Sequence, residues 1–360
     1  MDKIDYNRSD IPLRQKVTFG SRLLYSFDAA RKIDALLQKE QPDIAHLHNI
    51  CHQISPSILP VLRRHGIPIV QTVHDLKRVC PSYRMLSAKG ICERCRGGRF
   101  YHAIFQRCAK GSVSFSALNC LEAYFHQAIR IYDIIDLSIC PSVFYKDKLV
   151  SFGVDARRLE VLPNFVILQQ TPPANSRAYV LYCGQLGKQK GVLTLVRAFE
   201  RLPSTRLLLA GSGPEEPTIR RYIQARQMRN VELVGFVKGE RRARLMREAS
   251  FFVLPSEWYE NCPLVVLEAF AYAKPVVAAR IGGVPEQVKD GFNGLLFEPG
   301  NASQLREKIR YLDSHPEEVA RMGSNARKTA ERLYSPEVHY RKLMEIYERV
   351  IGRHRRKTAA

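Results

Sequence analysis

Residues 256–286 read SEWYENCPLVVLEAFAYAKPVVAARIGGVPE, and the architecture of the chain can be predicted outward from them. The apolar run FFVLP (251–255) comes directly before this stretch and predicts a strand that ends at Pro255. Pro263 then opens a helix at a position that proline favours, and PVVAA (275–279) predicts the next strand. Buried apolar strands that alternate with helices are typical of a parallel sheet covered on both faces. We therefore expect an α/β unit with 256–286 at the carboxyl edge of its sheet.

The same alternation runs along most of the chain. Further apolar strands are predicted at 43–48, 68–74, 136–140, 159–163, 178–184, 206–211, 231–235 and 294–298. A polar segment with a Pro pair, 166–177, interrupts the series and predicts a linker. The sequence thus predicts two Rossmann-like domains facing each other across a cleft. The predicted parts are an N-terminal domain (1–165), the linker, a C-terminal domain (178–334), and a helix with a basic tail (335–360).

The composition is that of a globular protein with an unusual charge. Of the 360 residues, 56 are Lys or Arg and 35 are Asp or Glu, which gives a net charge of +21. Residues 1–170 carry +9 and residues 171–360 carry +12, so the excess is not confined to a tail. Such a field favours phosphorylated ligands, anionic lipid or nucleic acid, but no nucleic-acid-binding motif accompanies it. The missing motifs lead us to expect no nucleic acid as partner. The polar start and the lack of a long apolar segment lead us to expect a cytoplasmic protein.

The basic charge is densest in segment 77–110, which has nine cations against Glu93 alone. Phe100, Tyr101 and Phe105 are interleaved with these cations. This pattern suits an anionic membrane surface, such as the inner face of the plasma membrane, to which the protein would bind peripherally. A solvated loop of a basic protein is the alternative.

The same segment holds four of the nine cysteines, Cys80, Cys92, Cys95 and Cys108. A central CxxC flanked by two further thiols has the ligand number of a structural zinc site. The outer spacings are irregular, and unliganded buried thiols fit the pattern equally well.

Two carboxylates mark the candidate active site. Glu260 falls in the loop after the strand 251–255, and Glu268 falls two turns into the following helix. The free amides at the start of this helix, near 261–265, suit a phosphate or a sugar hydroxyl. Gly282 and Gly283 come after the next strand and would let the backbone approach a ligand closely.

These motifs resemble the signature of family 4 glycosyltransferases, which have the GT-B fold. The similarity lies in the spacing of the two glutamates, in EAFAYAKPVVA (268–278) and in GGVPE (282–286). It continues through YCGQLGKQKGVLTLVRAF (182–199), LLLAGSGPE (207–215) and NGLLFEPGN (293–301). Weaker matches occur at PDIAHLHN (42–49) and QTVHD (71–75). The resemblance implies a retaining transfer of a sugar from a nucleotide-diphosphate donor to a glycan or lipid-linked acceptor.

The resemblance also implies roles for single residues. Glu260 would face the donor sugar and His74 would lie near the reacting centre, whereas Lys190 would bind the diphosphate and Glu268 the ribose. Neighbouring positions would complete the donor site: Gln185, Lys188, Asn261, Cys262, Leu264 and Gly283. The chain contains no Asp-x-Asp, which favours a metal-independent reaction without a required cofactor, in which Lys190 and helix dipoles stabilise the diphosphate.

Two departures from the family pattern keep other functions open. Gln185 stands where many members have arginine, and the usual first strand and Gly-rich turn of the N-terminal domain are missing from the predicted elements. A weakened nucleotide-sugar-binding partner subunit and a nucleotide-sugar epimerase of GT-B type are therefore alternatives to the transferase.

Overall fold

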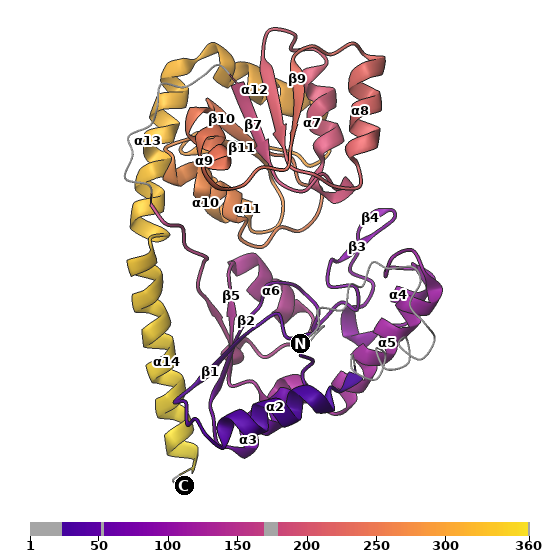
Figure 1. The fold of residues 1–360 in the computed structure, drawn as a ribbon, viewed down its shortest axis with the longest axis vertical. Helices are drawn as coiled ribbons and strands as arrows, with labels where there is room; N and C mark the ends of the chain where they lie inside the picture. Colours follow the sequence, from indigo (N-terminus) through magenta and orange to yellow (C-terminus); the bar gives the residue numbers. More distant parts are fainter. Residues whose placement is uncertain (1–23, 52–53, 169–178, 359–360) are drawn as a thin grey trace. The chain divides into compact units, whose positions relative to one another are not determined.

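The computed structural model describes residues 24–51, 54–168 and 179–358, and these form two compact units (Figure 1). The N-terminal unit comprises Met1–Cys140, Leu149–Glu160 and Ile346–Ala360, and the C-terminal unit comprises Pro141–Lys148 and Val161–Glu345. Most of the predicted linker (169–177) lies outside the described residues, and so does 1–23, where a first strand and Gly-rich turn would be sought. The predicted domain limits therefore stay predictions.

A six-stranded sheet forms the centre of the C-terminal unit, in the order β12-β11-β10-β7-β8-β9. Every neighbouring pair is parallel. The strands are β7 (Tyr179–Cys183), β8 (Arg206–Ala210), β9 (Val231–Gly235), β10 (Phe251–Leu254), β11 (Val276–Ala279) and β12 (Gly294–Phe297). β7 and β10 to β12 are almost wholly apolar, as expected for strands with both faces covered.

Helices cover both faces of this sheet (Figure 1). One core joins the sheet to α7 (Val192–Phe199), α8 (Glu216–Ala225) and α12 (Ala302–Ser314). The other joins it to α9 (Gly239–Glu248), α10 (Leu264–Ala271), α11 (Val284–Gln287) and α13 (Pro316–Leu333). Because the cores use alternate residues of the same strands, a register slip in a strand would turn its side chains to the opposite faces.

The order of the strands reverses between β7 and β10. From β7 the chain proceeds to β8 on one side, whereas from β10 it proceeds to β11 on the other. The loops that leave the carboxyl ends of these two strands diverge, and ligands of open α/β sheets bind at such a point. We therefore expect a ligand to contact the residues that follow Cys183 and Leu254.

The N-terminal unit has a smaller sheet of four strands in the order β1-β2-β5-β6. These are β1 (Ala45–His48), β2 (Ile69–Thr72), β5 (Leu137–Cys140) and β6 (Leu159–Val161), and β1, β2 and β5 pair in parallel. α2 (Phe27–Leu37) and α3 (Ile58–Arg64) share a core with this sheet. The unit also contains α5 (Val113–Ala128), whereas α6 (Val143–Ser151) begins in the segment that belongs to the C-terminal unit. All ten predicted strands are thus present, with bounds that differ by one or two residues.

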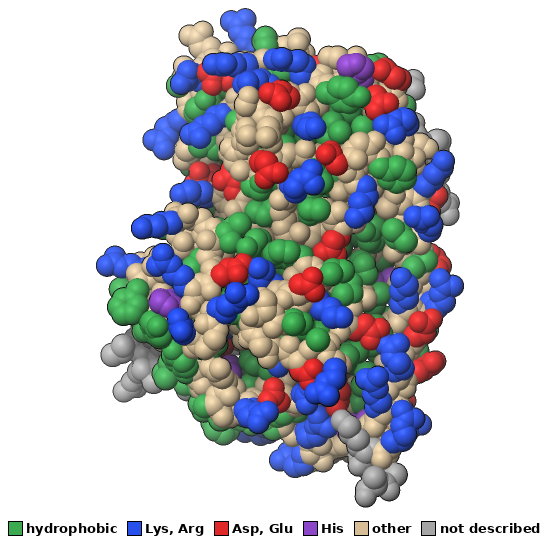
Figure 2. Space-filling view, turned by 180° about the vertical axis from the view of Figure 1, so that it is seen from behind, with side chains coloured by type: hydrophobic (Ala, Val, Ile, Leu, Met, Phe, Trp, Pro, Cys, Tyr) green, Lys and Arg blue, Asp and Glu red, His purple; other side chains and the backbone are tan. Residues whose placement is uncertain are grey.

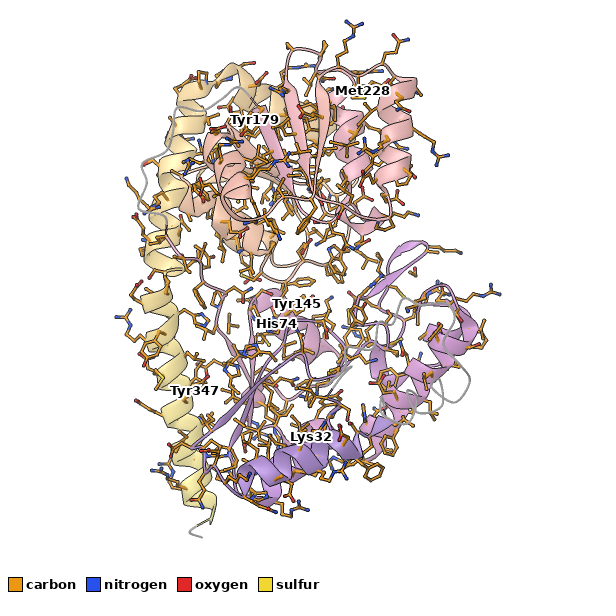
Figure 3. The ribbon with its side chains drawn as sticks, in the orientation of Figure 1. Lys32, His74, Tyr145, Tyr179, Met228 and Tyr347 are labelled. Carbon is orange, nitrogen blue, oxygen red and sulfur yellow. The ribbon has the colours of Figure 1, made fainter. Side chains whose placement is uncertain are left out.

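The C-terminal helix α14 (Pro336–Thr358) contributes residues to both units. In the N-terminal unit, the hydroxyl of Tyr347 (labelled in Figure 3) lies 2.6 Å from Nδ1 of His46 on β1. Arg349 of the same helix pairs with Glu160. The structure continues this helix through most of the predicted basic tail, to Thr358. Within the described part of the chain, no helix is both long and apolar enough to cross a membrane.

Candidate active site

An ion pair joins the loops at the strand reversal of the C-terminal unit. Lys190 ends a short 3-10 helix (Lys188–Lys190) after β7, and Glu260 lies in the loop after β10. The ammonium group of Lys190 donates to Oε1 of Glu260 at 2.7 Å. The structure thus brings together the residue predicted for the diphosphate and the one predicted for the sugar.

Two further side chains hold the Glu260 carboxylate in place. Ser256 Oγ and Trp258 Nε1 donate to its Oε1 at 2.6 and 2.9 Å. The Lys190 ammonium also lies 4.7 Å from the centre of the Trp258 ring, a cation–π contact. Glu260 is only 7% exposed, so its charge needs these partners to offset the loss of hydration. The result is a fixed negative charge next to a fixed positive one.

Glycine lets the backbones of these loops meet. Gly191 has φ +65°, and a Cβ there would lie 1.9 Å from the carbonyl oxygen of Pro255. At Gly283, a Cβ would lie 2.0 Å from the carbonyl oxygen of Asn261, and the Gly283 amide donates to the carbonyl of Glu260 at 2.8 Å. The backbone of Gly283 therefore supports the Glu260 loop, and its contact with a donor stays a prediction.

Glu268 has a partner that the sequence did not indicate. Arg242 on α9 donates to both oxygens of the Glu268 carboxylate, at 2.9 and 2.5 Å. The bonds to Glu268 raise the pKa of Arg242 above its ordinary value. Both side chains are about one-third exposed, so a ribose can compete for the carboxylate without entering a closed core.

The other residues predicted to bind the donor differ in accessibility. Gln185, Lys188 and Leu264 are exposed, and no side chain caps the first turn of α10, where Leu264 stands. Cys262 is buried among Leu267 and Tyr334, and burial raises the pKa of its thiol to about 12. Its side chain therefore belongs to the core, which leaves only its backbone for ligand contact. Asn261 is half-buried and accepts a hydrogen bond from Ser142 at 2.9 Å.

A histidine pair lies at the carboxyl ends of two strands of the N-terminal unit. His74 (labelled in Figure 3) follows β2, and His48 ends β1. Both side chains are exposed. Nδ1 of His48 is 2.7 Å from Nε2 of His74, a hydrogen bond that needs a proton on only one of the two nitrogens. Partial burial lowers the pKa of His74, and the neighbouring His48 lowers it further, whereas Asp75 raises it. The pair therefore favours a neutral imidazole.

Segment 77–110 is less uniformly basic at its surface than predicted. Lys77 is buried and donates to Glu122 at 2.7 Å, and Phe100 is only 5% exposed. Burial raises the pKa of Glu122 above its ordinary value, and the nearby positive charge of Lys77 only partly offsets this increase. Seven cations of the segment remain exposed, together with Tyr101 and Phe105: Arg84, Lys89, Arg94, Arg96, Arg99, Arg107 and Lys110. Figure 2 shows that Lys and Arg side chains are spread over the visible faces of both units, with exposed hydrophobic side chains among them.

Sequence reasoning missed four residues of these sites: His48, Arg242, Ser256 and Trp258. Ser256 and Trp258 stand within four residues of Glu260, and His48 ends a predicted strand as His74 does, so position alone could have indicated them. Arg242 is one of several arginines in a basic helix and carries no such signal.

Each half of the chain matches a known family of glycosyltransferases. Residues 5–170 match the family model "Glycosyltransferase Family 4", and residues 165–329 match "Glycosyl transferases group 1". The matches support a GT-B glycosyltransferase of the family 4 type.

Individual glycosyltransferases are similar to this chain at moderate identity. An uncharacterized glycosyltransferase of Methanocaldococcus jannaschii is 34% identical over 153 residues, which are 42% of this chain and 43% of that protein. Glycogen synthase of Mycobacterium tuberculosis is 31% identical over 297 residues, which are 80% of this chain and 64% of the synthase. The chain therefore spans less than two thirds of either relative.

Solved structures share the fold over nearly the whole chain. Sucrose-phosphate synthase from Thermosynechococcus elongatus superposes with a TM-score of 0.71 and 22% identity, covering 95% of this chain and 81% of that one. HepE from Anabaena in complex with UDP and glucose superposes with a TM-score of 0.65 and 19% identity, covering 89% of this chain and 80% of that one. With two Rossmann-like units built on parallel sheets, the protein has the GT-B fold.

Proposed function

We propose that this protein transfers a sugar from a nucleotide-diphosphate donor to an acceptor, with retention of the anomeric configuration. The observation that carries the proposal is the Lys190–Glu260 pair at the strand reversal, held by Ser256 and Trp258. Two family models of glycosyltransferases that together cover residues 5–329 support it.

The charges of this pair match those that develop when a glycosidic phosphate bond breaks. Negative charge grows on the departing diphosphate, where the ammonium group of Lys190 can stabilise it. Positive charge grows on the sugar, where the carboxylate of Glu260 can stabilise it. Fixed groups aimed at developing charge are worth roughly 3–4 kcal/mol each in well-studied sites. In our proposal a bound donor draws Lys190 toward the diphosphate, and Glu260 keeps its bonds to Ser256 and Trp258.

The other residues divide between donor and acceptor. Glu268, released from Arg242, would accept from the ribose hydroxyls, and the amides at the start of α10 would bind the diphosphate. Gln185, Lys188, Asn261 and Leu264 would line the donor. His74, oriented by His48, would serve the reacting centre from the N-terminal unit. Because HepE was solved with UDP and glucose, UDP-sugars are the first donors to test. No metal ion is required in this scheme.

A donor and acceptor screen tests the proposal. The full chain is incubated with radiolabelled UDP- and GDP-sugars, with and without lipid-linked and glycan acceptors, and the anomeric configuration of the product is read by NMR. Acceptor-dependent transfer with retention is expected. Interconversion of free donor sugars would instead indicate an epimerase, and donor binding without turnover would indicate a partner subunit.

We further propose that the acceptor is lipid-linked and that the seven exposed cations of segment 77–110 bind an anionic membrane. Each Lys or Arg near anionic headgroups contributes about 1 kcal/mol, an effect that salt screens. Reversal of Arg94, Arg96 and Arg99 to Glu should therefore abolish most co-sedimentation with anionic liposomes. The matched control reverses three exposed arginines of the C-terminal unit, Arg221, Arg229 and Arg241. Binding that is indifferent to salt, lipid charge and the first triple variant would contradict the membrane assignment.

A further inference from the structure

Segment 77–110 has little regular structure to hold its shape. It contains two strands of two residues, β3 (Leu86–Ser87) and β4 (Gly90–Ile91), one 3-10 turn, and the four-residue helix α4 (His102–Phe105). The backbone takes left-handed conformations at several non-glycine positions: Tyr83, Met85, Arg107 and Lys110. Such conformations persist only where the surroundings impose them, and small units of this kind usually need a cross-link or a metal.

The four cysteines of the segment come together around one cavity. Cys80, Cys92, Cys95 and Cys108 all line a space of about 10 Å³, with Val79, Met85 and Ala103 among the apolar neighbours. They arrive from different places: Cys80 ends a turn, Cys92 follows the hairpin, Cys95 starts the 3-10 turn, and Cys108 follows α4. Residues separated by up to 28 positions thus contribute the same chemical group to one point.

The cavity suits a single ion better than a water or an organic ligand. A volume of about 10 Å³ is at the lower limit for one water molecule and leaves no room for an organic ligand. Four sulfur ligands are the donor set that zinc selects, and a CxxC turn is a usual source of two of them. Gly97 and Gly98 follow the CxxC with φ +72° and +77°, so the chain turns sharply away behind Cys95.

The four thiols line the cavity but do not already form a metal-binding group. Across the described residues, no three His, Cys, Asp or Glu side chains are already spaced to coordinate a metal. Zinc–sulfur bonds are about 2.3 Å long, so binding would draw the sulfurs inward.

We propose that Cys80, Cys92, Cys95 and Cys108 bind one structural zinc ion that holds segment 77–110 together. The ion would also brace a larger cavity in the same unit. Val79, Cys95 and Phe152 line both the cysteine cavity and a space of about 420 Å³ whose lining includes the buried Lys77–Glu122 pair. Loss of zinc would therefore loosen the wall of that space as well as the segment. This inference is independent of the proposed transferase activity.

Metal content of the full chain tests the proposal. Protein purified from zinc-supplemented medium should hold about one zinc equivalent by elemental analysis, since structural sites bind tightly at neutral pH. The double variant Cys92→Ser/Cys95→Ser should retain less than about a tenth of that. Cys120→Ala is the matched control, because Cys120 is buried in the same small core as Cys95 and Phe100 but does not line the cavity. It should keep its zinc.

A spectroscopic measurement on the wild type keeps the test decisive if the double variant does not fold. Cobalt exchanged into the protein should give the strong visible absorption and sulfur charge-transfer bands of a tetrahedral thiolate site. Titration with a mercurial, which binds the thiolates and displaces the ion, should release one zinc equivalent as four thiols are modified. Metal-free protein with nine reactive thiols after denaturation would overturn the proposal in favour of buried thiols. Metal-free protein with fewer reactive thiols would overturn it in favour of disulfides.

Discussion

The two units handle buried charge in different ways. In the C-terminal unit, the buried carboxylate of Glu260 accepts three hydrogen bonds at one oxygen, from Ser256, Trp258 and Lys190. Glycines in the neighbouring loops let their backbones pack closely against this loop. In the N-terminal unit, Glu122 is fully buried on α5, and Lys77 donates to one of its oxygens. The other oxygen accepts no hydrogen bond among the described residues and lies 3.9 Å from Nδ1 of His126.

The difference separates a charge arranged for a ligand from one that supports structure. The Glu260 pair is partly open, with Lys190 22% exposed, so a ligand can exchange partners with it. The Lys77–Glu122 pair is 4% and 0% exposed, so its two charges depend mainly on each other for stabilisation. Variants of the two pairs should therefore affect different properties, activity in one unit and stability in the other.

The largest expected effect is on stability, from Lys77→Met. Removal of one partner from a buried ion pair leaves an unpaired charge and costs about 3–5 kcal/mol. The N-terminal unit should unfold at a markedly lower urea concentration, and Lys77→Met/Glu122→Leu should recover most of the loss. The control is Arg206→Ala, which breaks an exposed pair with Glu232 and should cost less than about 1 kcal/mol. Equal losses of stability in Lys77→Met and Arg206→Ala would show that the buried Lys77–Glu122 pair does not support the structure of the unit.

The next effect is on turnover, from Glu260→Gln. Loss of a charge that stabilises the transition state should lower kcat by about 100- to 1000-fold. Glu268→Gln should instead raise the KM for the donor with kcat nearly unchanged, because ribose contacts exist in ground and transition states alike. Glu232→Gln, on an exposed position of β9, serves as the control. The opposite pattern in the two active-site variants would show that their roles are exchanged.

How far the sequence could predict these sites depended on how local their contacts are. The ten strands followed from short apolar runs, whereas Lys190 and Glu260 were named by a resemblance in motifs at strand ends. Both signals lie within a few residues. The partner of Glu268 could not be predicted, since Arg242 reaches it from another helix. The burial of Lys77 and Phe100 was missed for the same reason. Lys77 meets Glu122 across 45 positions, and Phe100 packs against Cys120.

The two lysines of the turn after β7 sharpen the donor assignment. Lys190 meets Glu260, whereas Lys188 is exposed at the start of the same turn. A charge-assisted hydrogen bond contributes about 1.5–3 kcal/mol, so Lys190→Ala should weaken UDP binding by about 10- to 100-fold in a calorimetric titration. Lys188→Ala should change it by less than about threefold on the scale set for screened surface charges. If the larger loss follows Lys188→Ala, the diphosphate lies at the outer end of the turn.

The smallest expected effect is a shift in the pH profile, and it depends on the histidine pair of the N-terminal unit. Burial and the neighbouring His48 hold the pKa of His74 below its ordinary 6.5. The unfolded chain therefore takes up this proton at higher pH than the folded chain does, so stability falls as the pH drops through 6.5 toward the lowered value. Over the same interval kcat/KM should fall, because the protonated ring can no longer accept a proton at the reacting centre.

His48→Gln removes one cause of the lowered pKa of His74, so the acid limb of kcat/KM should move to higher pH. His65→Gln, which removes a histidine paired with Asp34 in the same unit, should leave the limb in place. An acid limb that stays in place in His48→Gln would show that His48 does not set the pKa of His74, and an activity that does not fall in acid at all would remove His74 from the reaction.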